Sequence, residues 1–178
     1  MTTHATVKIT PKGVEVNGKI ITSSSLSLND FYRKNIGDYP KFFKMDGLCK
    51  IGFVGAEILL KDLSVDEKND IAIVLFNRSG SLTTDRNYVQ TIRSNDNYFP
   101  SPALFVYTLA NIVTGEIAIR HQIYGESSFY VMQTNDKKLQ NEMIEGCFLT
   151  SSPSMILSGW VEYENEDDFF AEMNLLTK

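Results

Sequence analysis

The sequence predicts an α/β protein, because segments of strand character alternate along it with segments of helical character. A continuous apolar run at Ile71–Phe76 is typical of a strand that is covered on both faces of its sheet. The segment 46–60 is expected to be a helix that is buried on most sides, since apolar residues lie nearly all round it. Such an alternation within one chain is the pattern of an α/β domain.

Strand and helix signals recur along the rest of the chain. Strands are expected at 6–10, 14–21, 128–133 and 155–163, and helices at 30–34, 85–95, 112–123 and 136–148. The first two strand segments are joined at Pro11–Gly13, which is a hairpin signal, and Asn17–Gly18 offers a second turn. The beginning of the chain is therefore expected to fold back on itself as a hairpin.

Two of the expected helices have informative surfaces. The helix at 46–60 carries Gly52 and Gly55, which would let a neighbouring backbone approach closely. The helix at 136–148 has one apolar stripe and is polar over the rest of its circumference, so one of its faces is expected to meet water. The stripe consists of Leu139, Met143, Ile144, Cys147 and Phe148.

The last segment, 164–178, is acidic and is predicted to form a terminal amphipathic helix. Its apolar residues at helical spacing are Phe169, Phe170, Met173 and Leu176. Residues at this spacing share one face of a helix. We expect this face to pack on the body of the protein rather than to dock on a partner.

Length and composition indicate one globular domain that spans residues 1–178. The net charge is −5 and no cluster of lysine and arginine is present, which argues against binding to nucleic acid. The longest apolar stretch, Ile51–Leu60, contains Glu57 and is too short to span a bilayer. The residues Met1–Thr6 have neither a basic segment nor an apolar core, so we expect a cytoplasmic protein without membrane association.

Motifs for metals and cofactors are missing from the sequence. Cys49 and Cys147 are isolated and lack the C-x-x-C spacing of a metal or redox site, so both are expected to be small buried residues. The acidic turn at 66–70 lacks the central glycine of a calcium loop, and the loop around Gly80 lacks the pattern that cradles a phosphate. We therefore expect no metal and no cofactor.

The stretch Phe99–His121 carries the most specific signal in the chain. From Ser101 to Arg120 it reads S-P-x-x-F-x-x-T-L-x-N-x-x-x-G-x-I-A-I-R. This run resembles the one that leads into the active-site strand of the β-ketoacyl synthases, the condensing enzymes of fatty acid and polyketide synthesis. The resemblance extends over about Val7–Glu162. It implies a thiolase-like half-domain, a mixed sheet with helices on both faces, that corresponds to the N-terminal half of a ketosynthase.

The resemblance also shows what the chain lacks. In the family the active-site strand is followed by a cysteine that opens a helix and carries the acyl chain as a thioester. Here the strand is 128–133, and Thr134 and Asn135 stand at the elbow where the cysteine would be. The two histidines of the family lie in a C-terminal half that this chain does not contain. His121 falls at a position that the family uses for structure.

The sequence therefore predicts a protein without the catalytic cysteine and histidines. Such a protein resembles in role the chain-length factors, non-catalytic accessory subunits that accompany ketosynthases. The setting that the resemblance implies is fatty acid, polyketide or aryl-polyene and flexirubin-type biosynthesis. The polar surface of the helix at 136–148 agrees with the absence of the second half-domain, which covers this helix in a complete condensing enzyme.

The resemblance implies partners as well. In the family the strand before the nucleophile pairs with its copy across the two-fold axis of a dimer. Here the corresponding residues are Ser128, Phe129, Tyr130, Val131 and Met132. We expect a homodimer, or a heterodimer with another ketosynthase-like protein. Acyl carrier protein is a further candidate partner, although the acidity of the chain disfavours a docking patch for it.

Two other functions are compatible with the sequence. One is an active acyltransferase or 3-oxoacyl-acyl carrier protein synthase in which Cys147 or Thr134 replaces the missing nucleophile. The other is a simple acyl- or carrier-binding module, with a cleft near Phe105, Tyr107 and Asn135.

Overall fold

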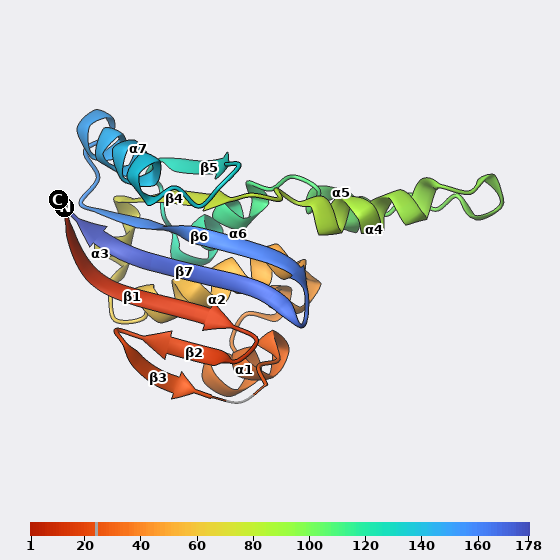
Figure 1. Ribbon diagram of the computed structural model, residues 1–178, viewed down its shortest axis with the longest axis horizontal. Helices are drawn as coiled ribbons and strands as arrows, with labels where there is room; N and C mark the ends of the chain where they lie inside the picture. Colours follow the sequence, from red (N-terminus) through yellow and green to blue (C-terminus); the bar gives the residue numbers. More distant parts are fainter. Residues whose placement is uncertain (24) are drawn as a thin grey trace.

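The computed structural model describes residues 1–23 and 25–178 and contains a seven-stranded mixed sheet (Figure 1). The strands are β1 (Thr2–Thr10), β2 (Gly13–Val16), β3 (Lys19–Thr22), β4 (Ile71–Asn77), β5 (Ser127–Val131), β6 (Met155–Asn165) and β7 (Asp168–Thr177). The helices are α1 (Leu28–Asn35), α2 (Gly47–Leu60), α3 (Val65–Asn69), α4 (Leu82–Ile92), α5 (Pro102–Val106), α6 (Ile112–His121) and α7 (Lys137–Thr150), with 3-10 turns η1 (Pro40–Lys44) and η2 (Asn95–Asn97).

The order of strands across the sheet is β3-β2-β1-β7-β6-β4-β5. Strand β4 pairs in parallel with both β5 and β6, whereas all other neighbours are antiparallel. Every residue of β4 is buried, as the continuous apolar run predicted. Strand β5 therefore forms one edge of the sheet and β3 forms the other.

The N-terminal strands form the predicted hairpin, and the segment expected as one strand at 14–21 is divided at Asn17–Gly18 into β2 and β3. Strands β1 and β2 pair with Thr10 opposite Gly13, and β2 and β3 pair with Val16 opposite Lys19. Asn17 and Gly18, which connect β2 to β3, have φ angles of 50° and 75°. Two successive residues with positive φ make the tight turn whose twist matches that of paired strands.

Helices cover both faces of the sheet (Figure 1). Helix α2 lies on one face with α6, and α7 lies on the other face against β4 and β6. The two glycines of α2 are where its neighbours come closest, as predicted. A side chain at Gly52 would overlap Val113 of α6, and one at Gly55 would overlap Met173 of β7. The missing side chains thus let α2 sit close to both the sheet and α6.

Helix α7 buries a stripe and exposes the rest. Ile144, Cys147 and Phe148 are buried, whereas Leu139 at the first turn is 40% exposed. Most of the polar residues of α7 are exposed, which agrees with the prediction that one face of this helix meets solvent. One polar residue departs from that pattern, because Gln140 is buried and its amide donates to Asn135 Oδ1 at 2.8 Å.

The prediction of a helix at 164–178 is wrong, because most of this segment is strand β7. Strand β7 lies between β6 and β1 and pairs with both along its length. Its burial alternates residue by residue, and the inward residues are Phe169, Ala171, Met173 and Leu175. The apolar residues fit both a helical and a strand periodicity. The segment forms a strand because its backbone groups form hydrogen bonds with both β1 and β6. Its alternate side chains then pack on α2.

Two helix boundaries differ from those expected at 85–95 and 112–123. Helix α4 begins earlier, at Leu82, and ends at Ile92. Helix α6 ends at His121 because Gln122 adopts the left-handed conformation, with φ 56°, and its N–H donates to Ala118 O. A left-handed residue at this position closes the last turn of a helix.

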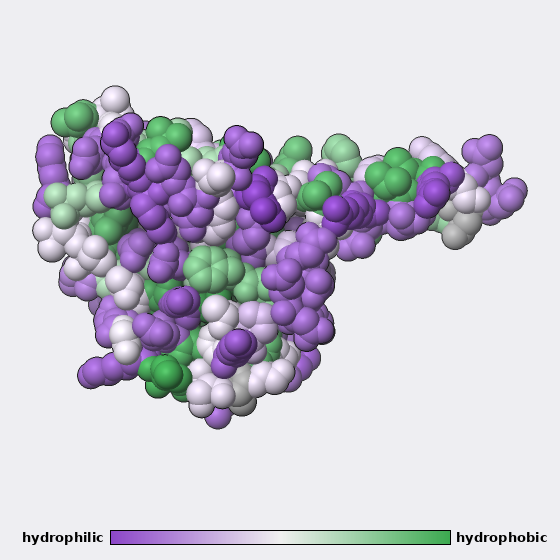
Figure 2. All heavy atoms as spheres, in the orientation of Figure 1, coloured by the Kyte–Doolittle hydropathy of each residue, from purple (hydrophilic) through white to green (hydrophobic). Residues whose placement is uncertain are grey.

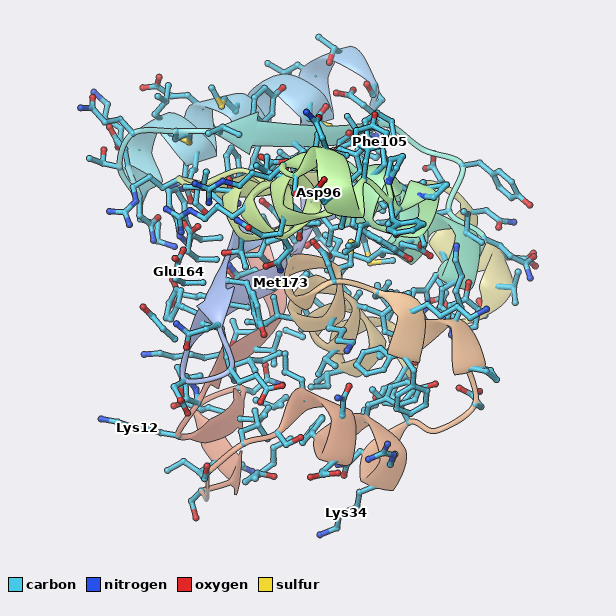
Figure 3. The ribbon with its side chains drawn as sticks, turned by 90° about the vertical axis from the view of Figure 1, so that its right-hand side faces the viewer. Lys12, Lys34, Asp96, Phe105, Glu164 and Met173 are labelled. Carbon is cyan, nitrogen blue, oxygen red and sulfur yellow. The ribbon has the colours of Figure 1, made fainter. Side chains whose placement is uncertain are left out.

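An arm made of α4, η2 and α5 projects from the body (Figures 1 and 2). Figure 3 looks along this arm and labels Asp96 and Phe105 on it. Several large apolar side chains of the arm are exposed, namely Leu82, Val89, Tyr98, Phe99, Phe105 and Val106. Within the described part of the chain, no helix has the length and apolar character needed to cross a bilayer.

The root of the arm is fastened to the body by hydrogen bonds. The Thr84 hydroxyl donates to Asp46 Oδ2 at 2.6 Å, and Asp46 also caps α2 by accepting from Cys49 N at 2.9 Å. On the returning side, the Tyr107 hydroxyl donates to Glu116 Oε1 at 3.2 Å. Both segments that connect the arm to the body are therefore held by buried or half-buried polar contacts, which fixes its direction.

Candidate functional site

The elbow between β5 and α7 lies at the carboxyl ends of the parallel strands. Strand β5 ends at Val131, and Met132 N still donates to Asn77 O of β4 at 2.8 Å. Asp136 then caps α7 by accepting from the backbone N–H groups of Lys138 and Leu139. In open α/β sheets, ligands bind outside the carboxyl ends of the strands.

Thr134 and Asn135 line a hollow of about 380 Å³ at this end of the sheet. The other residues that line it are Arg78, Gln133, Trp160, Glu162 and Phe170. The sequence reasoning missed the contributions of Arg78, which follows β4, and of strands β6 and β7. The only available signal was that Arg78 and Glu162 each stand near the carboxyl end of an expected strand.

The hollow offers no activated nucleophile among the residues that line it. The Thr134 hydroxyl has no histidine or lysine there to act as its base. Glu162 is engaged in holding the turn after β4, because it accepts from Arg78 N at 2.9 Å and from Ser79 N at 3.2 Å. The Asn135 oxygen accepts from Gln140. The residues that line the hollow thus place no histidine, lysine or thiol beside the Thr134 hydroxyl.

The two cysteines are not activated either. Burial raises the pKa of the Cys147 thiol to about 11, and the nearby Glu126 carboxylate adds to this effect. Cys49 is also buried, and its pKa lies well above the usual range for the same reason, with Asp46 contributing. A thiol must be deprotonated to act as a nucleophile, so neither cysteine is suited to that role near neutral pH.

The histidines lie away from the elbow hollow. His121 is the last residue of α6 and lines a separate hollow with Lys68 and Arg120. Burial, with the charges of these two residues, lowers the pKa of His121 to about 4. Its Nε2 lies 3.5 Å from Glu57 Oε1 but has no hydrogen-bond partner in the described chain. His4 is exposed on β1.

Phe105 and Tyr107, which were predicted to share a cleft with Asn135, do not line the elbow hollow. Phe105 lies on α5, is 52% exposed and packs against Tyr88 of α4, with ring centroids 5.5 Å apart. Tyr107 is buried at the end of α5 and donates to Glu116. These two residues thus belong to the arm and its attachment to the body.

The free edge of β5 is the other notable feature of this end of the molecule. Met132 N bonds to Asn77 of β4, and the direction of bonding alternates along a strand. The backbone N–H and C=O groups of Phe129 and Val131 therefore point away from β4. Val131 is 60% exposed, and a side chain built at Gly80, beside the root of the arm, would lie 3.8 Å from it. The edge and the arm are thus neighbouring surfaces.

Comparison with known proteins identifies the fold. No family model matches the sequence, and no curated protein matches it. The whole chain superimposes on a chain of the ketosynthase ApeO in complex with its chain length factor ApeC from Xenorhabdus doucetiae, with a TM-score of 0.69 and 14% identity, and covers 79% of that chain. It also matches the ishigamide ketosynthase/chain length factor over 99% of its length, with a TM-score of 0.72 and 14% identity, and spans only 61% of that chain. The whole chain therefore has the fold of part of a ketosynthase-type chain, the thiolase-like fold that the sequence predicted.

Proposed function

We propose that the protein is a non-catalytic, ketosynthase-like accessory subunit that pairs with a ketosynthase-type partner, in the manner of a chain length factor. The observation that carries this proposal is the elbow. Thr134 and Asn135 stand between β5 and α7, where the resemblance to the ketosynthases implies the cysteine, and no histidine or lysine lines the hollow beside them. Both similar structures are described as a ketosynthase with a chain length factor, which supports the same role. The setting would be the biosynthesis of a fatty acid, polyketide or aryl-polyene-type product.

The free edge of β5 is the proposed pairing surface. Antiparallel pairing with an equivalent strand would satisfy the outward N–H and C=O groups of Phe129 and Val131. Because the strand Ser128–Met132 is short, these two residues would supply most of the new hydrogen bonds. The same partner would then also cover the arm, which lies beside this edge. This would explain why the apolar side chains of the arm are exposed in the single chain.

The pairing can be tested with one variant and a matched control. Val131→Pro removes a backbone N–H that faces the free edge and leaves the bonds to β4 in place. Val131→Thr has nearly the same shape and keeps the N–H. We expect the first variant, but not the second, to lose the complex when each is co-expressed with a candidate ketosynthase-type partner and the mass is measured by light scattering. Equal complex formation by both variants would contradict pairing through this edge.

The catalytic role of the subunit is tested by acylation. The reconstituted complex is supplied with acyl-loaded acyl carrier protein, and the mass of each subunit is measured. We expect the acyl group on the partner only, and condensing activity that depends on this chain. An acyl adduct on this chain, located at Thr134 or Cys147, would instead support the acyltransferase. A lone homodimer on which no condensing activity depends would also contradict the accessory role.

A further inference from the structure

The turn that joins β4 to α4 connects the free edge of the sheet to the arm. The side chain of Asn77 closes this turn, because its Nδ2 donates to Gly80 O at 2.8 Å and its Oδ1 accepts from Gly80 N at 2.9 Å. Asn77 is fully buried and lies opposite Val131 in the parallel register of β4 and β5. The turn therefore begins beside the last residue of the free edge and ends at the root of the arm.

Glu162, at the end of β6, holds this turn from the neighbouring strand. Its Oε2 accepts from Arg78 N at 2.9 Å, and its Oε1 accepts from Ser79 N at 3.2 Å and from the Ser79 hydroxyl. Each carboxylate oxygen thus serves a different backbone N–H. Hydrogen bonds to an ionised carboxylate are stronger than bonds between neutral groups. An amide would fit less well, because one of its two ends is an NH2 group that cannot accept.

Glu164 extends this support to α4 itself. Its backbone oxygen accepts from the Thr83 hydroxyl at 3.2 Å, and its Oε1 lies 2.6 Å from Arg86 Nη1. The side chains of Arg86 and Glu164 are 57% and 44% exposed, so this ion pair contributes little. Glu162, which is less exposed and binds the backbone, is therefore the main polar support of the arm on this side.

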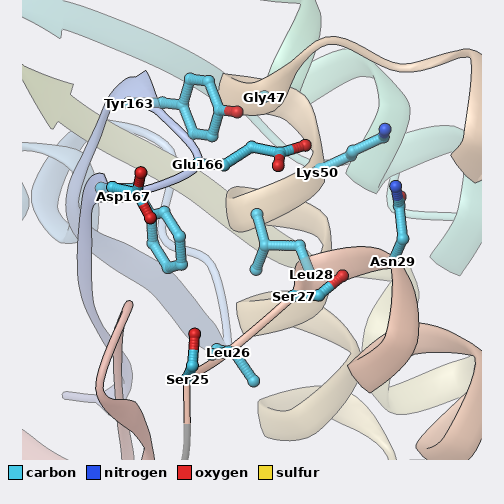
Figure 4. A pocket seen from close by; sticks show the side chains of 11 residues that line it. Ser25, Leu26, Ser27, Leu28, Asn29, Gly47, Lys50, Tyr163, Glu166 and Asp167 are labelled. Atoms are coloured by element: carbon cyan, nitrogen blue, oxygen red, sulfur yellow. The ribbon is translucent and has the colours of Figure 1, made fainter.

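The end of β6 is itself fixed on its other face. Figure 4 shows the Tyr163 ring beside Gly47 of α2, at the rim of a hollow between α1, α2 and the β6–β7 turn. Any larger residue at Gly47 would overlap the ring. The ring also stacks on Phe169 of β7, with centroids 6.1 Å apart and planes inclined by 12°. Because successive side chains of a strand point to opposite faces, Tyr163 packs on the body while Glu162 reaches the turn.

We propose that Glu162 is a positioning residue for partner binding. By holding the turn 77–80, it keeps the arm and the free edge of β5 in one fixed arrangement, so that a partner meets both surfaces together. A pre-arranged surface loses less conformational entropy on binding than two parts that move independently. This inference rests on the proposed function, because the partner is the ketosynthase-type subunit.

The position of the arm can be measured in the single chain. Nitroxide labels are attached at Asp96→Cys on the arm and Lys34→Cys on α1, both exposed positions, and pulsed electron paramagnetic resonance gives the distribution of distances between them. The two native cysteines are buried, and a chain without the introduced cysteines measures their background labelling. We expect a narrow distribution in the wild-type background and a broader or shifted one in Glu162→Gln. An unchanged distribution in Glu162→Gln would overturn the proposal.

The matched control is Glu172→Gln, on the neighbouring strand β7. The Glu172 carboxylate pairs with Lys137 of α7 at 2.7 Å rather than with the arm, so its loss should leave the distance distribution unchanged. Urea unfolding verifies that both variants are folded. A role in overall stability alone would lower the unfolding free energy of Glu162→Gln without altering the distance distribution.

Partner affinity is the second measurement. A candidate ketosynthase-type partner is titrated by calorimetry into the unlabelled wild type and the two variants. We expect Glu162→Gln to bind at least about tenfold more weakly and Glu172→Gln to bind like the wild type. Wild-type affinity in Glu162→Gln would overturn the positioning role alone. Failure of the wild type to bind would refute the accessory function and this role with it, so the two failures are distinguishable.

Discussion

His121 is expected to make the stability of the protein depend on pH. The histidine is buried in α6, and its pKa in the folded state is about 4, against an ordinary value of 6.5. Burial lowers the pKa most, Lys68 and Arg120 lower it further, and Asp38 raises it. The Glu57 carboxylate, 3.5 Å from Nε2, would also favour the protonated form, so the separation of the two pKa values is an upper limit. Because the folded-state pKa is the lower one, the unfolded chain takes up the proton first as the pH falls. Stability is therefore present above the unfolded-state value and is lost as the pH falls towards the folded-state value.

The size of this effect follows from the two pKa values. A separation of about 2.5 between the folded-state and unfolded-state pKa corresponds to at most about 3 kcal/mol of unfolding free energy. At about pH 5 the unfolded chain is largely protonated at this site while the folded chain is not, so roughly 2 kcal/mol should already be lost.

The assay is urea unfolding of the wild type and His121→Gln between about pH 7 and about pH 5. Glutamine cannot take up the proton, so the variant should lose roughly 2 kcal/mol less than the wild type over this range. His4→Gln, which changes the exposed histidine on β1, is the matched control and should retain the wild-type difference. Parallel stability curves for the wild type and His121→Gln would refute the reasoning.

Four further predictions concern packing, helix propensity, capping and thiol reactivity. Gly159→Ala should cost about 2 kcal/mol or more of unfolding free energy, because the new methyl group would overlap the backbone of Glu172 on the paired strand. Gly146→Ala, for which no atom lies within 4 Å, should instead stabilise α7 by about 0.5–1 kcal/mol. Asp136→Ala should cost about 1 kcal/mol, since it removes the side chain that caps α7. Cys147 should react with iodoacetamide slowly at neutral pH until the protein unfolds, because it is buried and its pKa is about 11.

Each of these predictions has a result that would contradict it. If Gly159→Ala leaves the unfolding free energy unchanged, β6 and β7 must be able to separate locally. If Gly146→Ala lowers the unfolding free energy, α7 must pack against its neighbours more closely at this position. Urea unfolding measures the unfolding free energy of both these variants and of Asp136→Ala. Wild-type stability of Asp136→Ala would exclude a capping role for Asp136. Rapid alkylation of Cys147 in the native protein would show that α7 opens or that the thiol is activated.

The sequence was sufficient to predict those elements whose structure depends only on residues within the element. The turns at Pro11–Gly13 and Asn17–Gly18 are set by residues within the turns themselves, so the hairpins were predictable. The burial of α2 was also predictable, because a helix that is buried on all sides has few polar residues. Its two glycines, Gly52 and Gly55, indicated where neighbouring elements approach it closely. At the elbow, the absence of a cysteine before α7 is a property of the sequence alone.

The elbow hollow was not predictable, because its lining comes from the segments that follow β4 and β5 and from strands β6 and β7. Arg78 follows β4, Thr134 and Asn135 follow β5, and Glu162 lies in β6. Which strands lie side by side is a non-local property, and the order β6-β4-β5 could not be derived from the residues near each strand. The expected cleft with Phe105 placed this residue at the elbow, whereas the structure places it on the projecting arm.

The sequence by itself determined the alternating elements, the first hairpin, the buried helix and the absence of a cysteine between β5 and α7, since each depends on neighbouring residues. Only the tertiary structure decided the state of the last segment, because Phe169 and Met173 fit a helix as well as a strand. The strand was favoured by two distant partners, β1 and β6, whose free backbone groups it satisfies. The same long-range pairing created the edge at β5 and brought the end of β6 beside the turn that follows β4, features that no local pattern contains.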